Sequence, residues 1–281
     1  MKLEEINKHM SAQLYCIFWY LQLSSLYAPV AHYKEEVRRL TEEVRRLGED
    51  LKDPKNKKKK DELKEEADRL TRLQKAMLLE QDQMINQQEL TLKHLSVLLP
   101  KVFAEMSDFE PKVVADNFVQ VCMYPRIILS AKDALFTFHF FKLLSSLEIP
   151  NFQLLYMLSS ILKYIVPVMH CCSEAEAESL GIFFAEIFKL LEHWSKRVNW
   201  RKECATNLSF ARKFKSDECI SFEEFTEKIV QNCGKLFSTQ LMSFLDKSEP
   251  MLFKARCCLI ILNRVANVMP TTFVSTIQKK L

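Results

Sequence analysis

Glycine is nearly absent from this chain: 3 glycines and 9 prolines stand among 281 residues. Tight hairpin turns and phosphate-binding loops both depend on glycine, because glycine adopts positive φ angles without strain. The shortage therefore argues against strand-rich folds and against doubly wound nucleotide-binding folds, and it favours helices. A hydrophobic content of 48% over this length supports a sizeable buried core, which excludes disorder throughout the chain.

An excess of charge of one sign is also lacking. The 40 basic and 36 acidic residues leave a formal net charge of +4, too little for the whole surface to attract nucleic acid. The 9 cysteines are an odd number with two adjacent pairs, so we expect reduced thiols instead of a disulfide framework. The opening MKLEEINKHM is charged where a signal peptide is apolar, so we expect no secretion. Lys163 and Pro167 interrupt the apolar stretch 152–172, so we expect no membrane span.

Motifs that enforce a known chemistry are missing, since the chain has no glycine-rich phosphate loop, no GxSxG and no HExxH. The nearest approach to a zinc site is the run His170-Cys171-Cys172 with His193 further on. Adjacent cysteines seldom bind one metal, because structural zinc sites use separated pairs. His139 lies among aromatics in LFTFHFF, which favours a core residue over a catalytic base. We therefore predict no enzyme, no metal, no cofactor and no small-molecule substrate.

The N-terminal half contains a buried segment followed by a coiled-coil pattern. Residues 14–26 are aromatic and apolar, which predicts one helix buried on most sides and ending near Pro29. Apolar residues then recur at steps of three and four, the seam of a coiled coil. The seam residues are Val37, Leu40, Val44, Leu47 and Leu51, then Leu63, Ala67, Leu70, Met77 and Met84, with Gln74 and Gln81 in polar slots. The intervening KDPKNKKKK contains a proline and like charges, which predicts a hairpin tip.

From Pro111 onward the pattern is a succession of apolar helical segments, with breaks expected at four prolines, Pro125, Pro150, Pro250 and Pro270. Capping-box spacings, Ser173 with Glu176 and Ser221 with Glu224, mark two helix starts. The predicted fold class is all-α: a helical-repeat, α-solenoid-like scaffold with a projecting antiparallel coiled-coil hairpin. The expected parts are an N-terminal buried helix region 1–30, the hairpin 31–99 with a basic tip at 52–60, and a helical-repeat body 100–281.

The lysine run at the tip has two interpretations. It consists of Lys55, Lys57, Lys58, Lys59 and Lys60. One interpretation is a solvated tip; the other is a nuclear localisation signal or a contact to RNA phosphates, because such runs bind polyanions without reading sequence. No aromatic residue is interleaved with the lysines, so base stacking is not indicated.

Several strings, in order, resemble the central region of the THO complex subunit 2 family. The most specific is FVQVCMYPRIILSAKDAL, where six residues match the family's pattern: Cys122, Pro125, Arg126, Ser130, Asp133 and Ala134. The others include FWYLQLSSLYAPVAHYKEEV, DPKNKKKKDEL, CCSEAEAESLGIFF, HWSKRVNWRKEC and ARCCLIILNRVANVMP. Ile127 and Cys257 depart from the pattern, so the chain resembles a divergent, shortened or fragmentary member.

The resemblance implies a non-enzymatic scaffold subunit of the THO part of the TREX complex, in the nucleus, acting in mRNA processing and nuclear mRNA export. It implies contacts with other THO subunits and with the export helicase, and an indirect or weak association with mRNA. From the residues themselves, a generic helical-repeat adaptor and a direct RNA binder acting through the basic tip stay open. For Arg126, Asp133 and Arg256 we favour capping or pairing within the helical stack, with a partner contact as the alternative.

Overall fold

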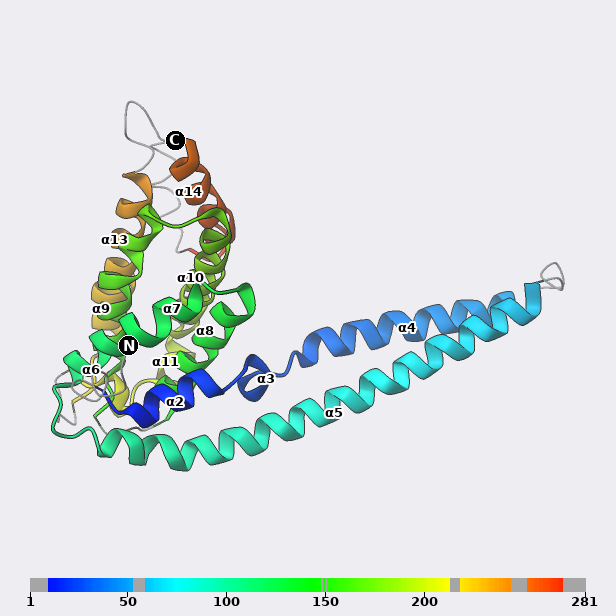
Figure 1. Ribbon diagram of the computed structural model, residues 1–281, viewed down its shortest axis with the longest axis horizontal. Coiled ribbons are helices and arrows are strands. Elements are labelled where there is room, and N and C mark those ends of the chain that lie inside the picture. The colour runs from blue at the N-terminus through cyan, green and yellow to red at the C-terminus, as the bar shows by residue number, and fades with distance from the viewer. Residues whose placement is uncertain are drawn as a thin grey trace. The chain divides into compact units, whose positions relative to one another are not determined.

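The computed structural model describes residues 10–52, 59–147, 149, 151–212, 218–243 and 252–269. These residues are mainly helical and contain no β-strand, only an isolated antiparallel bridge between Ala211 and Cys219, so the all-α class is confirmed. The α-helices are α2 (Ala12–Tyr20), α3 (Leu23–Leu26), α4 (Val30–Asp50), α5 (Lys60–Ala104), α6 (Pro111–Phe118), α7 (Tyr124–Ile127), α8 (Ala131–Ser146), α9 (Leu154–Tyr164), α10 (Glu174–Trp194), α11 (Arg197–Glu203), α12 (Phe222–Glu224), α13 (Gln231–Met242) and α14 (Leu252–Val265) (Figure 1). Two π-helical segments, η2 (Val119–Met123) and η5 (Phe225–Val230), and two 3-10 segments, η3 (Val166–His170) and η4 (Leu208–Phe210), lie between them.

The chain divides into two compact units. One, here called the body, comprises Met1–Leu23 and Leu95–Leu281; the other, here called the α4–α5 pair, comprises Ser24–His94. Helix α5 therefore belongs to the pair up to His94 and to the body beyond it. The three-part domain division and the solenoid-like stacking stay predictions.

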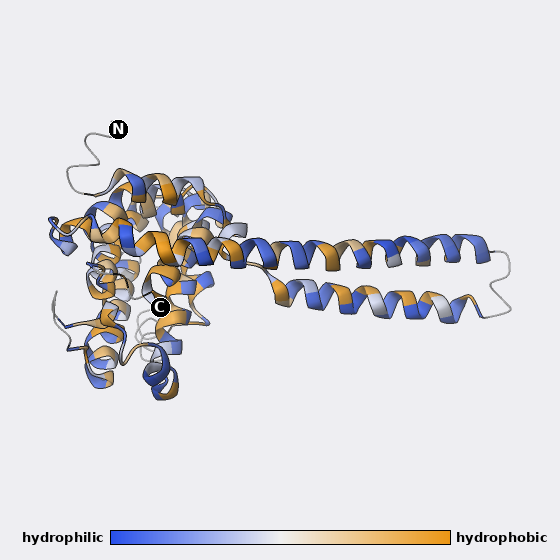
Figure 2. Ribbon diagram, turned by 90° about the horizontal axis from the view of Figure 1, so that it is seen from below, coloured by the Kyte–Doolittle hydropathy of each residue, from blue (hydrophilic) through white to orange (hydrophobic). Residues whose placement is uncertain are grey.

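In the α4–α5 pair the two long helices run side by side (Figures 1 and 2). The hydroxyl of Tyr33 donates to Met84 Sδ at 3.1 Å, and Gln74 Nε2 donates to Thr41 Oγ1 at 2.7 Å. Residue numbers rise along one helix while they fall along the other, so the helices are antiparallel. Of the predicted seam residues Leu40, Leu70 and Gln81 are buried and the others are half-buried, as expected when two helices share a narrow seam.

The N-terminal segment differs from the prediction of one helix over residues 14–26. Helix α2 ends at Tyr20, Leu21 has an extended backbone with φ −71° and ψ 152°, and α3 follows. The expected burial on most sides was also wrong, because Leu14 and Phe18 face inward while Tyr20 is 86% exposed. The break has a tertiary cause, the side chain of Arg126, described below.

Contrary to the prediction, Pro125 does not separate two helices. Helix α6 begins with Pro111 in its first turn and continues through the π-helical segment η2 into α7, which contains Pro125. A π-helical turn widens the backbone ahead of the proline, so the ring has room and the missing N–H does not end the helix. Pro150, Pro250 and Pro270 lie outside the described residues.

Helix α10 is the centre of the body and packs against α8 and α14. It begins at the predicted capping box, in which Ser173 Oγ accepts from the Glu176 N–H at 3.3 Å and Glu176 Oε2 accepts from the Ser173 N–H at 2.7 Å. The second predicted box, at Ser221, is also confirmed. The apolar residues of α10 recur at spacings of three and four and are buried: Leu180, Phe183, Phe184, Ile187, Phe188 and Leu191. Gly181 permits a close approach of α14, since a Cβ there would lie 3.0 Å from Arg264 Cβ.

Candidate protein-interaction site

Arg126 is a buried polar residue of the body with partners on α2 and α8. It lies on α7, is only 6% exposed, and donates from Nε to Asp133 Oδ1 at 3.0 Å. Its Nη1 donates to the carbonyl of Phe18 and its Nη2 to the carbonyl of Leu21, the latter at 2.7 Å. These carbonyls belong to the end of α2, where a helix has backbone acceptors without partners. The guanidinium therefore terminates α2 from a distant part of the chain.

Aromatic rings and a second hydrogen bond complete this tie. The Arg126 Cζ lies 3.5 Å from the centroid of the Phe136 ring, a stacking geometry that suits a planar guanidinium. Asp133 Oδ2 accepts from Ser130 Oγ at 2.7 Å, so the carboxylate is held by the cap of α8. Burial lowers the pKa of Arg126, while Asp133 acts in the opposite direction. Both residues face into the body.

Arg256 lies at the surface, between α14 and the first turn of α10. Its side chain is 61% exposed, and its Nε and Nη2 contact the two carboxylate oxygens of Glu174 at 3.2 Å and 3.3 Å. Arg264, two turns further along α14, pairs with Glu178 at 2.8 Å. The geometry thus pairs Arg256 across two helices, while its exposure leaves one side of the guanidinium open to solvent.

A polar cluster that the sequence did not indicate centres on Asp116 of α6. Asp116 accepts hydrogen bonds from Ser160 at 2.5 Å, Tyr164 at 3.0 Å and Lys163 at 3.2 Å, all on α9. Burial raises the pKa of the Asp116 carboxyl, but the hydrogen bonds from Ser160, Tyr164 and Lys163 together outweigh burial, so the pKa is lowered. Asp116 is 44 to 48 positions from its three partners along the chain, so no local sequence pattern could have revealed the cluster.

The histidines and cysteines considered for zinc are engaged separately. His170 Nε2 contacts Gln240 Oε1 at 2.7 Å, and His193 Nε2 contacts Glu203 Oε1 at 2.8 Å. Burial and the neighbouring thiol of Cys257 raise the pKa of Cys172 to about 12, so its sulfur stays protonated. Within the described ranges no three side chains of histidine, cysteine, aspartate or glutamate gather as metal ligands. Burial, followed by the positive charge of Lys142, lowers the pKa of His139 to about 4. Its imidazole is therefore neutral at pH 7.

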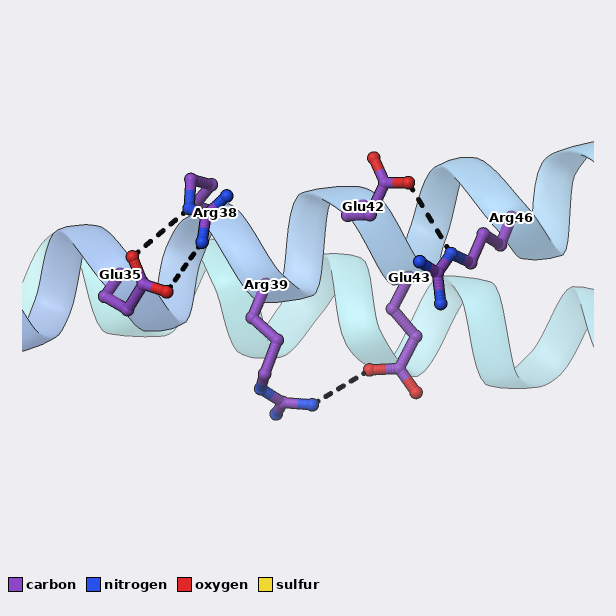
Figure 3. A pocket seen from close by; sticks show the side chains of 6 residues that line it. All are labelled: Glu35, Arg38, Arg39, Glu42, Glu43 and Arg46. Carbon is purple, nitrogen blue, oxygen red and sulfur yellow. Dashed lines mark hydrogen bonds and ion pairs between the residues drawn. The ribbon is translucent and has the colours of Figure 1, made fainter.

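Helix α4 carries closely spaced surface charges of both signs. On α4 three arginines and three glutamates line a shallow hollow of about 450 Å³: Glu35, Arg38, Arg39, Glu42, Glu43 and Arg46 (Figure 3). The arginines pair with glutamates three or four residues away, for example Arg38 with Glu35 at 2.7 Å and Arg39 with Glu43 at 3.2 Å. Such spacings place opposite charges beside each other on one helix face, so this surface largely neutralises itself.

The predicted lysine tip is only partly described. Lys59 and Lys60 are exposed at the start of α5, whereas Lys55, Lys57 and Lys58 lie outside the described residues. The interpretation of the tip as a polyanion or localisation site stays a prediction. In the described part of the chain, no helix combines the length and the apolar character needed to cross a membrane.

A family model described as transcription factor/nuclear export subunit protein 2, Tho2, matches residues 7–281. The chain belongs to the Tho2 family. It is 26% identical to THO complex subunit 2 of Arabidopsis thaliana over 272 residues, which cover 94% of this chain and 14% of that protein. It is 29% identical to the Homo sapiens protein of the same name over 207 residues, which cover 72% of this chain and 12% of that protein. A shorter match, 36% over 76 residues, links it to the Saccharomyces cerevisiae protein and covers 27% of this chain.

This membership confirms the resemblance drawn from the sequence strings, since the family match contains all of them. The chain corresponds to one seventh or less of each of these relatives. Among the residues of the most specific string, Arg126, Ser130 and Asp133 are brought together in one hydrogen-bonded tie. In this Tho2-family chain the string therefore coincides with the junction between α2, α7 and α8.

Proposed function

We propose that this chain is a non-enzymatic scaffold piece of a THO complex subunit, acting in mRNA processing and nuclear mRNA export through protein–protein contacts. The single observation that carries the proposal is the Tho2 family match over residues 7–281. The expected partners are other THO subunits and the export helicase, the expected location is the nucleus, and mRNA associates indirectly or weakly.

The way in which the chain uses its polar groups supports a scaffold role. Arg126, Asp116 and Glu203 each hold helices or helix ends together, through distances of 2.5–3.2 Å. Groups engaged in this way fix the positions of the helices that they join. Helices of this kind present ridged surfaces that suit partner helices.

Affinity purification of the tagged chain from nuclear extract, with nuclease treatment, tests the proposal. We expect THO subunits or the export helicase to be recovered, as identified by mass spectrometry, and to stay bound after nuclease. Their absence from a preparation whose circular dichroism shows folded helices would refute the proposal and favour a generic helical adaptor.

A variant of the basic tip separates protein contact from RNA bridging. Replacing the five tip lysines, Lys55, Lys57, Lys58, Lys59 and Lys60, by glutamine removes the positive charge that would attract phosphates. A protein scaffold recovers the same subunits with this variant. Loss of the subunits both in the variant and after nuclease would instead indicate a chain that reaches its neighbours through RNA.

A further inference from the structure

The sequence contains two pairs of adjacent cysteines that the proposed scaffold function does not use. Cys171 and Cys172 lie directly before α10, and Cys257 and Cys258 lie in the first half of α14. Cys172, Cys257 and Cys258 are buried, at 4%, 1% and 1% exposure, whereas Cys171 is exposed. All four are free thiols. The fold brings the two pairs together at one junction, because α14 packs along α10.

Cys172 and Cys257 are in direct contact at this junction. Cys257 Sγ donates to the backbone carbonyl of Cys172 at 3.4 Å, across 85 positions of the chain. The two thiols also hydrogen-bond to each other. The next side chain on α14, that of Arg256, contacts Glu174 at 3.2 Å. Two successive side chains of α14 thus meet the segment 172–174, which places both sulfurs at the contact between α14 and the start of α10.

Neither thiol is held firmly in its present position. Cys172 Sγ donates to the carbonyl of Met169 at 3.4 Å, and Cys257 Sγ donates to the carbonyl of Cys172 at the same distance. A thiol is a weak hydrogen-bond donor, so little stabilisation is lost when both sulfurs turn away from these carbonyls and towards each other.

Cys257 is the sulfur that loses its proton more readily. Burial raises the pKa of Cys257, but the hydrogen bond from Cys172 and the positive charge of Arg256 act in the opposite direction. For Cys172 burial and the neighbouring Cys257 both raise the pKa, to about 12. Because the thiolate is the nucleophile, Cys257 is suited to react first and Cys172 to react with the product.

We propose that Cys172 and Cys257 are an oxidation site, at which hydrogen peroxide converts the two thiols into a disulfide that ties α14 to the start of α10. The inference goes beyond the scaffold function and does not depend on it. Intracellular proteins seldom keep permanent disulfides, and those that form there are usually transient and redox-sensing. A free pair that closes under oxidation and reopens in thiol reductant fits this pattern.

The reaction has two steps. The Cys257 thiolate attacks one oxygen of the peroxide, the O–O bond breaks, and the leaving hydroxide is released as water with the former thiol proton, which leaves Cys257 as a sulfenic acid. The Cys172 sulfur then attacks the Cys257 sulfur, the S–O bond breaks, and the hydroxyl leaves with the Cys172 proton as a second water. Two thiols lose two electrons in total, and one peroxide is reduced to two waters.

Peptide mapping of the full chain tests the proposal. The dilute chain is treated with hydrogen peroxide, its remaining thiols are alkylated, and the monomer is digested with trypsin without reduction. We expect the tryptic peptides 164–189 and 257–264 to appear as one linked species that lacks two hydrogen atoms and separates in dithiothreitol. Fragmentation between the adjacent cysteines locates the linked sulfurs in the wild-type chain, so the test does not require any variant to fold.

The pH supplies a second readout. The thiolate fraction of a group far below its pKa rises about tenfold for each pH unit, so the linked species should form several-fold faster at pH 8 than at pH 7. Exposed Cys171 shows that the peroxide treatment was effective. Oxidation of Cys171 while Cys172 and Cys257 stay free for alkylation after unfolding would overturn the proposal.

Cys258 provides the matched control. It is the next residue on the same helix and is as deeply buried as Cys257. Cys257→Ala and Cys172→Ala should each abolish the linked species, whereas Cys258→Ala and Cys171→Ala should retain it. A bond between Cys171 and Cys172, or one that uses Cys258, would overturn the assignment of the pair.

The stability of the oxidised chain tests whether the bond ties the helices. A disulfide that closes a loop of 85 residues restricts the unfolded chain strongly. We expect the oxidised wild-type chain to unfold at a Tm higher by about 5 °C or more in thermal circular dichroism, and dithiothreitol to reverse the rise. Cys257→Ala should show no rise after peroxide. An unchanged or lower Tm of the linked wild-type chain would overturn the tie.

Discussion

Replacing Arg126 by methionine removes the tie that terminates α2 while keeping a side chain of similar length. The carbonyls of Phe18 and Leu21 and the carboxylate of Asp133 then lose their donor inside the body. Removal of one partner from a buried ion pair costs about 3–5 kcal/mol. Because the Asp133 side chain keeps 29% exposure and can take up water, we expect the lower end, about 3 kcal/mol.

The assay should follow the body without the α4–α5 pair, and the tryptophans allow this. All 3 tryptophans, Trp19, Trp194 and Trp200, lie in the body, so tryptophan fluorescence during urea or thermal unfolding reports that unit. For a unit of roughly 200 residues, about 3 kcal/mol corresponds to a fall in Tm of about 6–12 °C. Arg256→Met is the matched control: its pair with Glu174 is exposed, so the expected loss is below about 1 kcal/mol.

Arg126→Lys separates charge from geometry. A lysine keeps the positive charge but cannot reach Asp133 and both carbonyls with one ammonium, and it loses the stack on Phe136. We expect the free energy of unfolding of Arg126→Lys to lie between those of the wild type and Arg126→Met. Equal stability of Arg126→Met and Arg256→Met would refute the reasoning, since a buried and an exposed arginine would then contribute alike.

Four further substitutions concern single positions. Gly181→Ala should destabilise the body by about 1 kcal/mol, since the new Cβ would lie 3.3 Å from Ile261 Cα. Gly48→Ala should instead raise the helicity and stability of the α4–α5 pair, as followed by circular dichroism, because no atom lies within 4 Å of the new Cβ. Ser173→Ala removes the capping box of α10 and should lower the free energy of unfolding by about 1 kcal/mol in urea titrations. His139→Gln should flatten the fall in stability as the pH drops from 6.5 towards 4: burial depresses the folded-state pKa to about 4, so the unfolded chain takes up the proton first.

Features set by neighbouring residues were predictable from the sequence. The capping boxes at Ser173 and Ser221 depend on residues three apart, and the buried stripe of α10 depends on spacings of three and four. The break after Tyr20 was not predictable, because it depends on Arg126, which is 108 residues from Phe18 in the chain. Proline was misleading at Pro125 for a related reason, since a π-helical turn outside any propensity rule accommodates it.

The polar sites also include features that the sequence predicted and features that it did not. The string around Arg126 and Asp133 drew attention to the right residues, yet the sequence could not say that the guanidinium faces two carbonyls of α2. The cluster around Asp116 joins α6 to α9 and left no trace in local spacing. Long-range partners of single polar residues depend on the packing of the helices, so they emerge only when the fold is known.

The glutamines on the α5 side of the seam give the α4–α5 pair a further property. Because Gln74, Gln81 and Gln88 occupy seam positions that leucine fills in stable coiled coils, the pair gives up apolar stabilisation in exchange for a fixed register. Any helix that binds the folded pair and not the unfolded chain raises the stability of the pair by RT ln(1 + [L]/Kd). Binding of a helix to the folded pair and ordering of the pair are therefore thermodynamically linked.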